Sequence, residues 1–347
     1  MSLEIIEINE VEKWDNIVKS FKDYDVYYLN GYVSAFKLHG DGEPLLIYFN
    51  NNITRAINVV IKRDISQCEE FKNIISENTY FDFSTPYGYG GFIVEGSDIE
   101  QINNEYSEYC IKNNIICEVV RYHPVLCNSY NTNKIYDVKN IGTTVTIDTS
   151  NYNEIWNNIT SKNRNMIRKA KKNNIKIYWG RDDYLIDEFM QIYNSTMDKD
   201  NAKLYYYFER DFYKSILNDL KYNAQFFYAK LDNEIISMSI ILFANNKVHY
   251  HLSGSKIDFQ HLAPTNLLIY EVACWSCMNG YKSLHLGGGL GAKEDSLYKF
   301  KKSFYKGDDT RFDIGKKIYN VDLYNELVDI ASKNKSLDEN YFPLYRS

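Results

Sequence analysis

Apolar residues recur along the second half of the chain with two spacings, one typical of helices and one typical of strands. Helical spacing predicts helices over residues 152–172, 183–197, 208–220, 265–279 and 295–302. Alternating or continuous apolar runs predict strands over residues 175–179, 225–231, 235–243, 248–252 and 283–286. Asp232-Asn233 and Asn245-Asn246 separate three consecutive strands, so two hairpins are expected there. Pro264 and Gly280 mark the beginning and the end of the helix 265–279.

The first half carries a shorter series of the same elements. Helical spacing occurs over residues 11–21 and 99–112, and strand-like runs over residues 45–49, 56–61, 92–94 and 115–122. A chain of 347 residues suits two domains better than one. The order therefore predicts an α/β (α+β) fold with two similar lobes, each a mixed, mostly antiparallel sheet flanked by helices. The boundary falls near Thr146–Asn151, which gives lobes 1–148 and 149–347.

The strands on either side of the helix 265–279 form the part of the fold most relevant to chemistry. A strand–helix–strand crossover makes these two strands parallel neighbours. Ligands of open α/β sheets bind at the carboxyl ends of parallel strands. Here those ends carry Ser253-Gly254-Ser255 and Gly287-Gly288-Gly289. We expect the two strands to separate after Leu252 and Leu286 and to leave a site where two reactants can bind.

Composition narrows the class of partner and the compartment. The net charge is -6, so the chain lacks the general basic surface of a nucleic-acid binder, and a polyanion would need a local basic patch. The first residues do not form a basic segment followed by an apolar one, and no apolar run approaches the roughly 18 residues that span a bilayer. A cytoplasmic protein whose six cysteines are thiols is expected. Cys274 and Cys277 form a C-x-x-C inside an apolar run and are assigned to the core.

A basic run lies within the predicted helix 152–172. Its members are Lys162, Arg164, Arg168, Lys169, Lys171 and Lys172, with no acid between them. Like charges this close on one helix face destabilise an isolated helix, so a bound anion is a natural counterpart. The candidate anions are tRNA phosphates, a diphosphate-linked sugar and CoA. The alternative is a solvated face that meets carboxylates elsewhere in the fold.

A stretch rich in glycine and tyrosine, Thr85–Gly91, is a candidate substrate site. Gly90 permits a tight turn, and Tyr87 and Tyr89 can offer ring faces and hydroxyls to a sugar or a nucleotide. Asp82, which precedes the stretch, is a candidate general base or substrate anchor. The alternative is a packed hairpin turn.

Histidines mark the two parallel strands. His249 and His251 alternate along one strand, so the period of two predicts that they face one side together. Either neutral imidazole could take a proton from an attacking ammonium group, and the alternative is a buried, hydrogen-bonded pair. On the other strand, His285 precedes Gly287–Gly289, whose backbone N–H groups could hold an oxyanion or a phosphate, unless this is only a flexible turn. Ser253 completes the predicted substrate contacts.

Several stretches, taken in order, match the pattern of a known family. These stretches are Asp82–Gly91, Ser161–Ala170, Tyr193–Met197, Tyr205–Phe208, His249–Ser255, His285–Gly289 and Asp295–Phe304. The chain resembles the Fem family of peptidoglycan-bridge aminoacyltransferases and their FemAB-like relatives within the GNAT superfamily. The resemblance implies tandem GNAT-like lobes and the transfer of an acyl or aminoacyl group to an amine. Lys301, in the F-K-x-x-F pattern, would neutralise an oxyanion or a phosphate; the alternative is an ordinary surface lysine.

Two departures from the family pattern concern the donor. The chain has no room for the long helical arm that Fem enzymes binding charged tRNA often insert. Gln260–Thr265 stands where GNAT enzymes carry Q/R-x-x-G-x-G/A for CoA, but Ala263 replaces a glycine and Pro264 lacks an N–H. The start of the following helix could still attract an anion. Both aminoacyl-tRNA and acyl-CoA therefore remain candidate co-substrates, with no tightly bound cofactor and no metal.

These observations lead to a hypothesis of direct transfer with the chemistry in the second lobe. An amine of a cell-wall precursor or amino sugar would attack an activated carbonyl without a covalent enzyme intermediate. Asp82 or a strand histidine would accept the proton. The acceptor would be a small-molecule or lipid-linked sugar, the latter reached by peripheral contact with the membrane. The alternatives are a CoA-dependent N-acyltransferase of surface-polysaccharide sugars and a non-catalytic module that binds a sugar phosphate or RNA.

Overall fold

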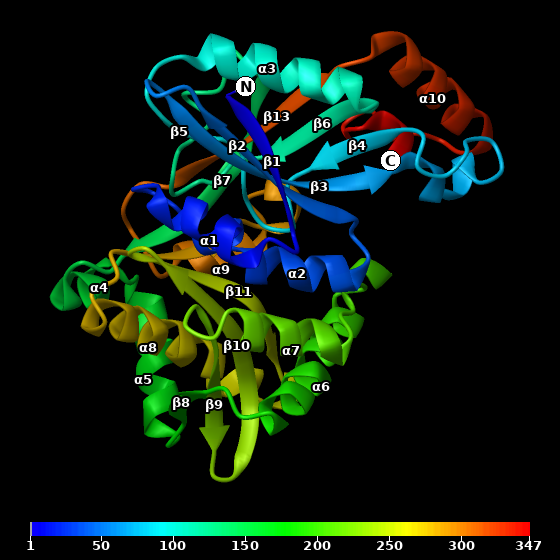
Figure 1. The fold of residues 1–347 in the computed structure, drawn as a ribbon. Helices are drawn as coiled ribbons and strands as arrows, with labels where there is room; N and C mark the ends of the chain where they lie inside the picture. The colour runs from blue at the N-terminus through cyan, green and yellow to red at the C-terminus, as the bar shows by residue number, and fades with distance from the viewer. Residues whose placement is uncertain (1) are drawn as a thin grey trace. The chain divides into compact units, whose positions relative to one another are not determined.

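Two compact units make up the fold, and the chain leaves the first unit and later returns to it (Figure 1). The computed structural model describes residues 2–347. Unit 1 combines the residues up to Ile141 with Phe312–Ser347, and unit 2 is Gly142–Arg311. The chain crosses between them inside strand β7 (Asp137–Asp148) and again inside strand β13 (Thr310–Ile318). This grouping differs from the expected lobes 1–148 and 149–347, because the residues after 311 complete unit 1.

Unit 1 is a mixed sheet with mostly antiparallel pairs. Besides β13, its strands are β1 (Leu3–Glu7), β2 (Glu43–Asn50), β3 (Arg55–Asp64), β4 (Phe81–Ser84), β5 (Ile93–Glu95) and β6 (Ile115–Arg121). They lie in the order β1-β2-β3-β4-β6-β13, and β5 pairs with β3. The pair β4–β6 is parallel, and the pair β6–β13 is antiparallel from Ile314 opposite Arg121 to Ile318 opposite Cys117. This last pairing attaches the end of the chain to unit 1.

The helices of unit 1 bury two apolar clusters against the sheet. The helices are α1 (Val11–Ser20), α2 (Asn30–His39), α3 (Ile99–Lys112) and α10 (Val321–Asn334). In one cluster Ile102 and Tyr106 of α3 pack with Val120 of β6. In the other, Leu327 of α10 packs with Ile116 of β6 and with Tyr345 in a short 3-10 turn (Leu344–Arg346). The core of unit 1 therefore depends on residues from both ends of the chain.

Unit 2 has its own mixed sheet and six helices among its described elements. Besides β7, its strands are β8 (Lys176–Gly180), β9 (Ala224–Leu231), β10 (Glu234–Ala244), β11 (Lys247–Ser255) and β12 (Ser283–Gly287). Its helices are α4 (Tyr152–Asn158), α5 (Ser161–Lys172), α6 (Tyr184–Lys199), α7 (Arg210–Asp219), α8 (Pro264–Met278) and α9 (Ser296–Lys302). The sheet order is β7-β12-β11-β10-β9-β8, in which β11 and β12 are parallel and the other pairs are antiparallel.

Helices lie on both faces of the unit 2 sheet. Phe227 belongs to the apolar cluster that includes residues of α5 and α8, whereas its neighbour Phe226 meets Phe189 of α6. Because successive residues of a strand point to opposite faces, α8 and α6 cover different sides. The predicted class, an α/β fold with two lobes that each carry a mixed sheet flanked by helices, is confirmed. Within residues 2–347, every helix is too short or too polar to cross a bilayer.

A β-bulge in β11 changes which residues face α6. Ile240 of β10 pairs with Leu252 and Ile241 pairs with Tyr250, so the register skips His251. Tyr250 packs against the α8 cluster, whereas a Cβ on Gly254 would lie 2.8 Å from the carbonyl oxygen of Ile192 in α6. Residues 250 and 254 are an even number of positions apart, so in a regular strand they would face the same side. The one inserted residue places them on opposite sides. The bulge therefore brings Gly254 against the backbone of α6.

The Gly254→Ala substitution is expected to lower the free energy of unfolding by about 1–3 kcal/mol, because its Cβ would overlap the α6 backbone. Urea unfolding followed by circular dichroism measures the change. Gly180→Ala is the matched control, because the atom nearest to its added Cβ would be 3.7 Å away, and it should change stability by less than about 0.5 kcal/mol. Equal effects of the two substitutions would contradict the close approach of α6.

Candidate active site

The parallel pair in unit 2 opens at a defined residue. β11 and β12 pair at Lys247 with Ser283, Val248 with Leu284 and His249 with His285, and in the part of the chain that the structure describes their pairing ends there. Both strands then continue on other neighbours, β11 along β10 to Ser255 and β12 along β7 to Gly287. The expected separation of these strands is therefore found, and it begins earlier than at Leu252 and Leu286.

His249 and His285 lie opposite each other at the last paired position. Their ring centroids are 5.9 Å apart at an angle of 67°. Both are buried, and the Nδ1 atom of His285 lies 2.9 Å from the hydroxyl of Thr146 on β7. Their strand neighbours Val248 and Leu284 belong to the α8 cluster, so both histidines face the opposite side of the sheet. The structure thus places His249 and His285 together at the point of separation.

His251 does not share the regular alternation of His249. It is the residue that the bulge inserts, so strand period alone does not decide whether His249 and His251 face one side. Burial and the nearby His249 lower the pKa of His251 to about 3. An imidazole with so low a pKa stays neutral at neutral pH but is a weak proton acceptor. His251 is therefore a poorer general base than the sequence suggested.

The glycine loop after β12 is held against α9. Lys301 donates from Nζ to the carbonyl oxygen of Gly288 at 2.7 Å. Asp295 caps α9, accepting from the backbone N–H of Tyr298 at 2.8 Å and from that of Leu290 at 2.9 Å. A Cβ on Gly289 would collide with the backbone carbonyl oxygen of Lys293 and with the Asp295 carboxylate, so this position requires glycine. The sequence motifs His285–Gly289 and Asp295–Phe304 thus form one assembly.

Lys301 has the electrostatic setting of a functional amine. Burial lowers the pKa of Lys301 to about 8, although the carboxylate of Asp295 acts to raise it. Its neighbour Lys302 instead donates to Asp309 at 2.7 Å and to the carbonyl oxygen of Gly307 at 2.6 Å. Lys302 therefore pins the turn that follows α9. The role of Lys301 in the reaction remains a proposal.

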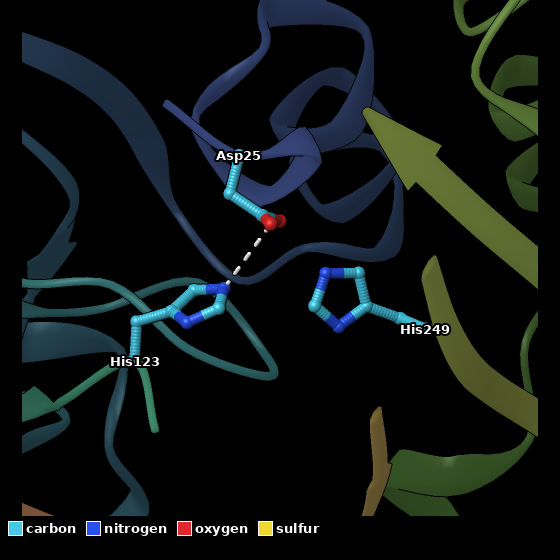
Figure 2. A group of neighbouring side chains, drawn as sticks. All are labelled: Asp25, His123 and His249. Carbon is cyan, nitrogen blue, oxygen red and sulfur yellow. Dashed lines mark ion pairs between the residues drawn. The ribbon is translucent and has the colours of Figure 1, made fainter. Parts of the chain in front are cut away.

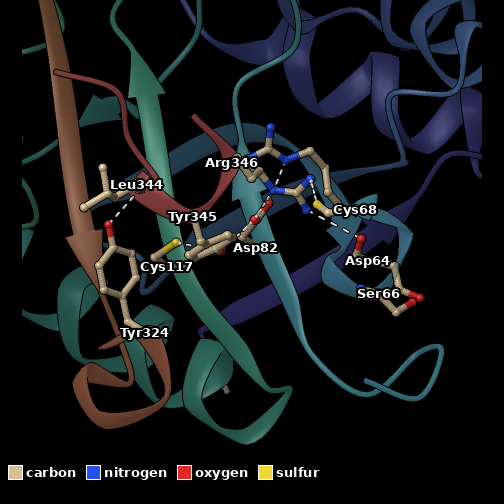
Figure 3. Close-up of polar contacts among 10 residues, drawn as sticks. Asp64, Ser66, Cys68, Asp82, Cys117, Tyr324, Leu344, Tyr345 and Arg346 are labelled. Atoms are coloured by element: carbon tan, nitrogen blue, oxygen red, sulfur yellow. Dashed lines mark hydrogen bonds and ion pairs between the residues drawn. The ribbon is translucent and has the colours of Figure 1, made fainter. Parts of the chain in front are cut away.

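Asp82 lies in unit 1 and forms buried ion pairs (Figure 3). Its Oδ1 accepts from Arg63 at 2.6 Å, and its Oδ2 accepts from Arg346 at 2.5 Å and from the Tyr345 hydroxyl at 2.8 Å. Burial alone would raise the pKa of Asp82, but the charges of Arg63 and Arg346 and these hydrogen bonds lower it. A fully buried carboxylate with both oxygens engaged is a poor proton acceptor. The geometry therefore favours a structural role for Asp82 over the predicted catalytic one.

The tyrosine and glycine stretch of unit 1 is tightly packed. The Tyr87 ring stacks on Phe36, and the Tyr87 carbonyl oxygen accepts from the Tyr32 hydroxyl at 2.5 Å. Burial raises the pKa of Tyr89 to about 12, and a Cβ on Gly90 would lie 2.8 Å from Thr85. These contacts match the packed-turn alternative, and a substrate role for Tyr87, Tyr89 and Gly90 remains a proposal.

Sequence reasoning missed a buried histidine–carboxylate pair in unit 1 (Figure 2). His123 Nε2 lies 3.4 Å from Asp25 Oδ2, and both side chains are fully buried. The backbone N–H of Leu126 donates to His123 Nδ1 at 3.2 Å, so the proton of a neutral His123 lies on Nε2 and faces Asp25. No local motif predicts this pair, because Asp25 and His123 come from distant parts of the sequence.

The basic run on α5 is partly engaged within unit 2. Lys171 pairs with Glu271 of α8 at 2.8 Å, as the solvated-face alternative expected. Arg164 donates to Ser161 at 3.3 Å and Arg168 to Asn165 at 3.0 Å. Lys162 and Lys169 are exposed. Four residues of the run, Lys162, Arg164, Arg168 and Lys169, remain proposed anion contacts.

The beginning of α8 lies beside the same helix. Ala263 takes the left-handed conformation, with φ 62°, that glycine adopts most readily. Asn266 in the first turn of α8 donates to Asn163 Oδ1 at 2.8 Å. Among residues 2–347, no hydrogen-bond partner for the buried Asn163 Nδ2 is found. A buried amide donor near a helix N-terminus is suited to an anionic ligand.

Comparisons with known proteins agree with the fold. Residues 160–306 match the family model described as an acetyltransferase (GNAT) domain. The chain superposes on the crystal structure of FemX with a TM-score of 0.68 and 16% identity, over 94% of this chain and 99% of that one. No curated protein matches the sequence.

Two further solved structures share the fold. One is the C-terminal domain of a protein described as a putative lysylphosphatidylglycerol synthetase from Agrobacterium fabrum, with a TM-score of 0.56, 11% identity, and coverage of 93% of this chain and 95% of that one. The other is a conserved protein of unknown function from Bacteroides thetaiotaomicron, with a TM-score of 0.56, 10% identity, and coverage of 91% and 99%. These likenesses extend over both units, whereas the family model covers most of unit 2.

Proposed function

We propose that this chain, a FemAB-like acyltransferase of the GNAT superfamily, moves an aminoacyl or acyl group onto the amine of a cell-wall precursor or amino sugar. The neutral amine attacks the activated carbonyl directly. A tetrahedral oxyanion forms and then collapses, and the proton that the amine nitrogen loses ends on the leaving group, which departs as the tRNA hydroxyl or the CoA thiol. No covalent bond to the enzyme is needed, so catalysis rests on positioning and on electrostatic stabilisation.

The observation that carries this proposal is the end of pairing between β11 and β12 after His249 and His285. Beyond this point the facing edges of the two strands no longer bond to each other, and an extended ligand is proposed to bind along them. The loop Gly287–Gly289 and Lys301 lie directly beyond β12. A carbonyl group bound there could accept hydrogen bonds from the backbone N–H groups of the loop and from the ammonium group of Lys301.

Lys301 is proposed to stabilise the oxyanion. Its Nζ is already held by the Gly288 carbonyl oxygen, so little ordering is required when the negative charge develops. An ammonium group with two remaining N–H donors can bond to the oxyanion while it keeps this contact. Ser253, on β11 beyond the last pair with β12, is proposed to contact the substrate from the other strand.

The donor is proposed to place a phosphate near the beginning of α8. Asn163 Nδ2, the helix N-terminus and the basic residues of α5 together offer donors to an anion. Both proposed donors, aminoacyl-tRNA and acyl-CoA, carry phosphates. Pro264 supplies no N–H to that anion, which distinguishes this loop from the usual CoA loop.

Offering acyl-CoA and aminoacyl-tRNA separately tests the donor. A donor present at 100 times its Kd is expected to raise the free energy of unfolding by about 2.7 kcal/mol. Mass spectrometry of amino-sugar and lipid-linked acceptors then shows whether an amine gains the acyl group. Stabilisation and transfer with acyl-CoA alone would favour the alternative, a CoA-dependent N-acyltransferase of surface-polysaccharide sugars. If neither donor transfers a group to any of the amines offered, the proposed function is contradicted.

A further inference from the structure

Three polar side chains form a row across the middle of the unit 2 sheet. His249 on β11 lies opposite His285 on β12, and His285 lies opposite Thr146 on β7. The neighbouring residues Leu284 and Ile147 belong to the α8 cluster, so the row occupies the other face of the sheet. The row crosses the sheet at the last position where β11 and β12 pair.

A threonine from a fourth strand extends the row. The Thr310 hydroxyl, at the start of β13, donates to the Thr146 hydroxyl oxygen at 3.0 Å. The Thr144 hydroxyl donates to the carbonyl oxygen of Thr310 at 3.3 Å and so holds this residue in place. Thr146 in turn lies 2.9 Å from Nδ1 of His285. The hydrogen-bond chain therefore runs from Thr310 through Thr146 to His285.

The direction of these hydrogen bonds decides where the proton of a neutral His285 lies. A hydroxyl has one proton, and Thr146 already accepts the proton of Thr310. If Thr146 donates its own proton to Nδ1, the His285 proton must be on Nε2. The reverse arrangement would make Thr146 accept twice, and its own proton would need another acceptor. Among residues 2–347, the side chain of Thr146 has only these two hydrogen-bond partners.

We propose that Thr146 and Thr310 are positioning residues that hold His285 as the Nε2–H tautomer at the point where β11 and β12 separate. His285 then serves the transfer as a hydrogen-bond donor to the reacting carbonyl, whose oxygen becomes the oxyanion. It does not take the proton of the attacking amine, because its Nδ1 lone pair is occupied by Thr146. This role rests on the proposed acyl transfer and specifies what His285 does in that reaction.

Nitrogen NMR tests the hydrogen-bond chain without any substrate. The protein is labelled with ¹⁵N-histidine, and long-range ¹H–¹⁵N spectra of its six histidines are recorded. The His285→Gln variant identifies the His285 signals. The expected wild-type pattern at pH values where His285 is neutral is a protonated Nε2 and an unprotonated Nδ1. A protonated Nδ1 would overturn the proposal.

Three threonine variants make this experiment sharper. Thr146→Val should abolish the preference for Nε2–H, whereas Thr146→Ser, which keeps the hydroxyl, should preserve it. Thr149→Val is the matched control, because the buried Thr149 hydroxyl donates to the carbonyl oxygen of Tyr281 and is not part of the row. An unchanged tautomer in a folded Thr146→Val protein would overturn the proposal.

Kinetics then test the role of the tautomer in the reaction. Thr146→Val should lower kcat at least about 10-fold with KM within about twofold, and Thr146→Ser should restore kcat to within about threefold of wild type. Loss of the tautomer with unchanged kcat would overturn the positioning role. If the wild-type protein transfers no group from either donor, the proposed function fails, but the NMR result still decides whether Thr146 sets the tautomer, and Thr310→Val in the same experiment decides whether Thr310 contributes.

Discussion

Replacing Lys301 with alanine is expected to lower kcat for acyl transfer by about 10²- to 10³-fold, with the fold intact. The lost ammonium group is proposed to stabilise charge that develops only in the transition state, so kcat and kcat/KM should fall together. Lys299→Ala is the matched control, because Lys299 is an exposed lysine on the same helix. Initial rates with the identified donor and thermal unfolding of each variant measure the two effects. Wild-type activity in Lys301→Ala would remove Lys301 from the mechanism.

The pKa of Lys301 sets the pH at which this contribution ends. Because burial lowers the pKa to about 8, the activity that depends on the ammonium form should decline as the pH rises through about 8. The effect on stability has the opposite direction. The folded protein holds this proton less tightly than the unfolded chain does, so Lys301 opposes folding below about pH 8. This cost decreases as the pH rises further toward the ordinary lysine pKa.

Replacing Arg346 with alanine is expected to lower the free energy of unfolding by about 3–5 kcal/mol. The substitution removes one of two guanidinium groups that compensate the fully buried carboxylate of Asp82. It also removes the contact between Arg346 Nη1 and Cys68 Sγ at 2.9 Å. Urea unfolding near neutral pH measures the loss. Lys335→Ala, which breaks the more exposed ion pair with Glu70, should cost no more than about 1 kcal/mol.

Two further measurements separate the buried charge from simple loss of packing. The stabilising contribution of Asp82 should be present above its unfolded pKa and should disappear as the pH falls through the lowered folded value. Adding Asp82→Asn to Arg346→Ala removes the carboxylate charge and should recover part of the lost stability. If the double variant is destabilised by the sum of the single effects, the two residues are not coupled. Loss of transfer activity in a folded Asp82→Asn protein would restore the catalytic hypothesis for Asp82.

The elements of unit 2 could be predicted from the sequence because their signals are local. The turn Asp232-Asn233 lies between β9 and β10 as expected, and Pro264 begins α8. The crossover through α8 makes β11 and β12 parallel, and their separation follows from the same topology. The Gly287–Gly289 loop and Lys301 have similar predicted roles toward an oxyanion or a phosphate, and the structure joins the two by a hydrogen bond.

The remaining features depend on contacts that no local pattern records. His251 lies in a bulge because β11 must satisfy both α8 and α6, and a regular alternation along one strand cannot indicate this. Asp82 pairs with Arg346, and the sequence between them includes the whole of unit 2. The membership of β13 and α10 in unit 1 likewise depends on pairing with β6. Motif spacing alone therefore could not show that Asp82 is buried between two arginines.

The position of β13 in unit 1 has a consequence for protein synthesis. The ribosome makes β4 and β6 before unit 2, but β13, which pairs with the other edge of β6, and helix α10 emerge only after all of unit 2 has been made. Unit 2 is continuous from Gly142 to Arg311, so it can reach its native structure while unit 1 still lacks β13, which lies between β6 and β7 in the sheet. During translation the unpaired edge of β6 is therefore exposed for as long as unit 2 is being made, which is when a chaperone would be most useful to this chain.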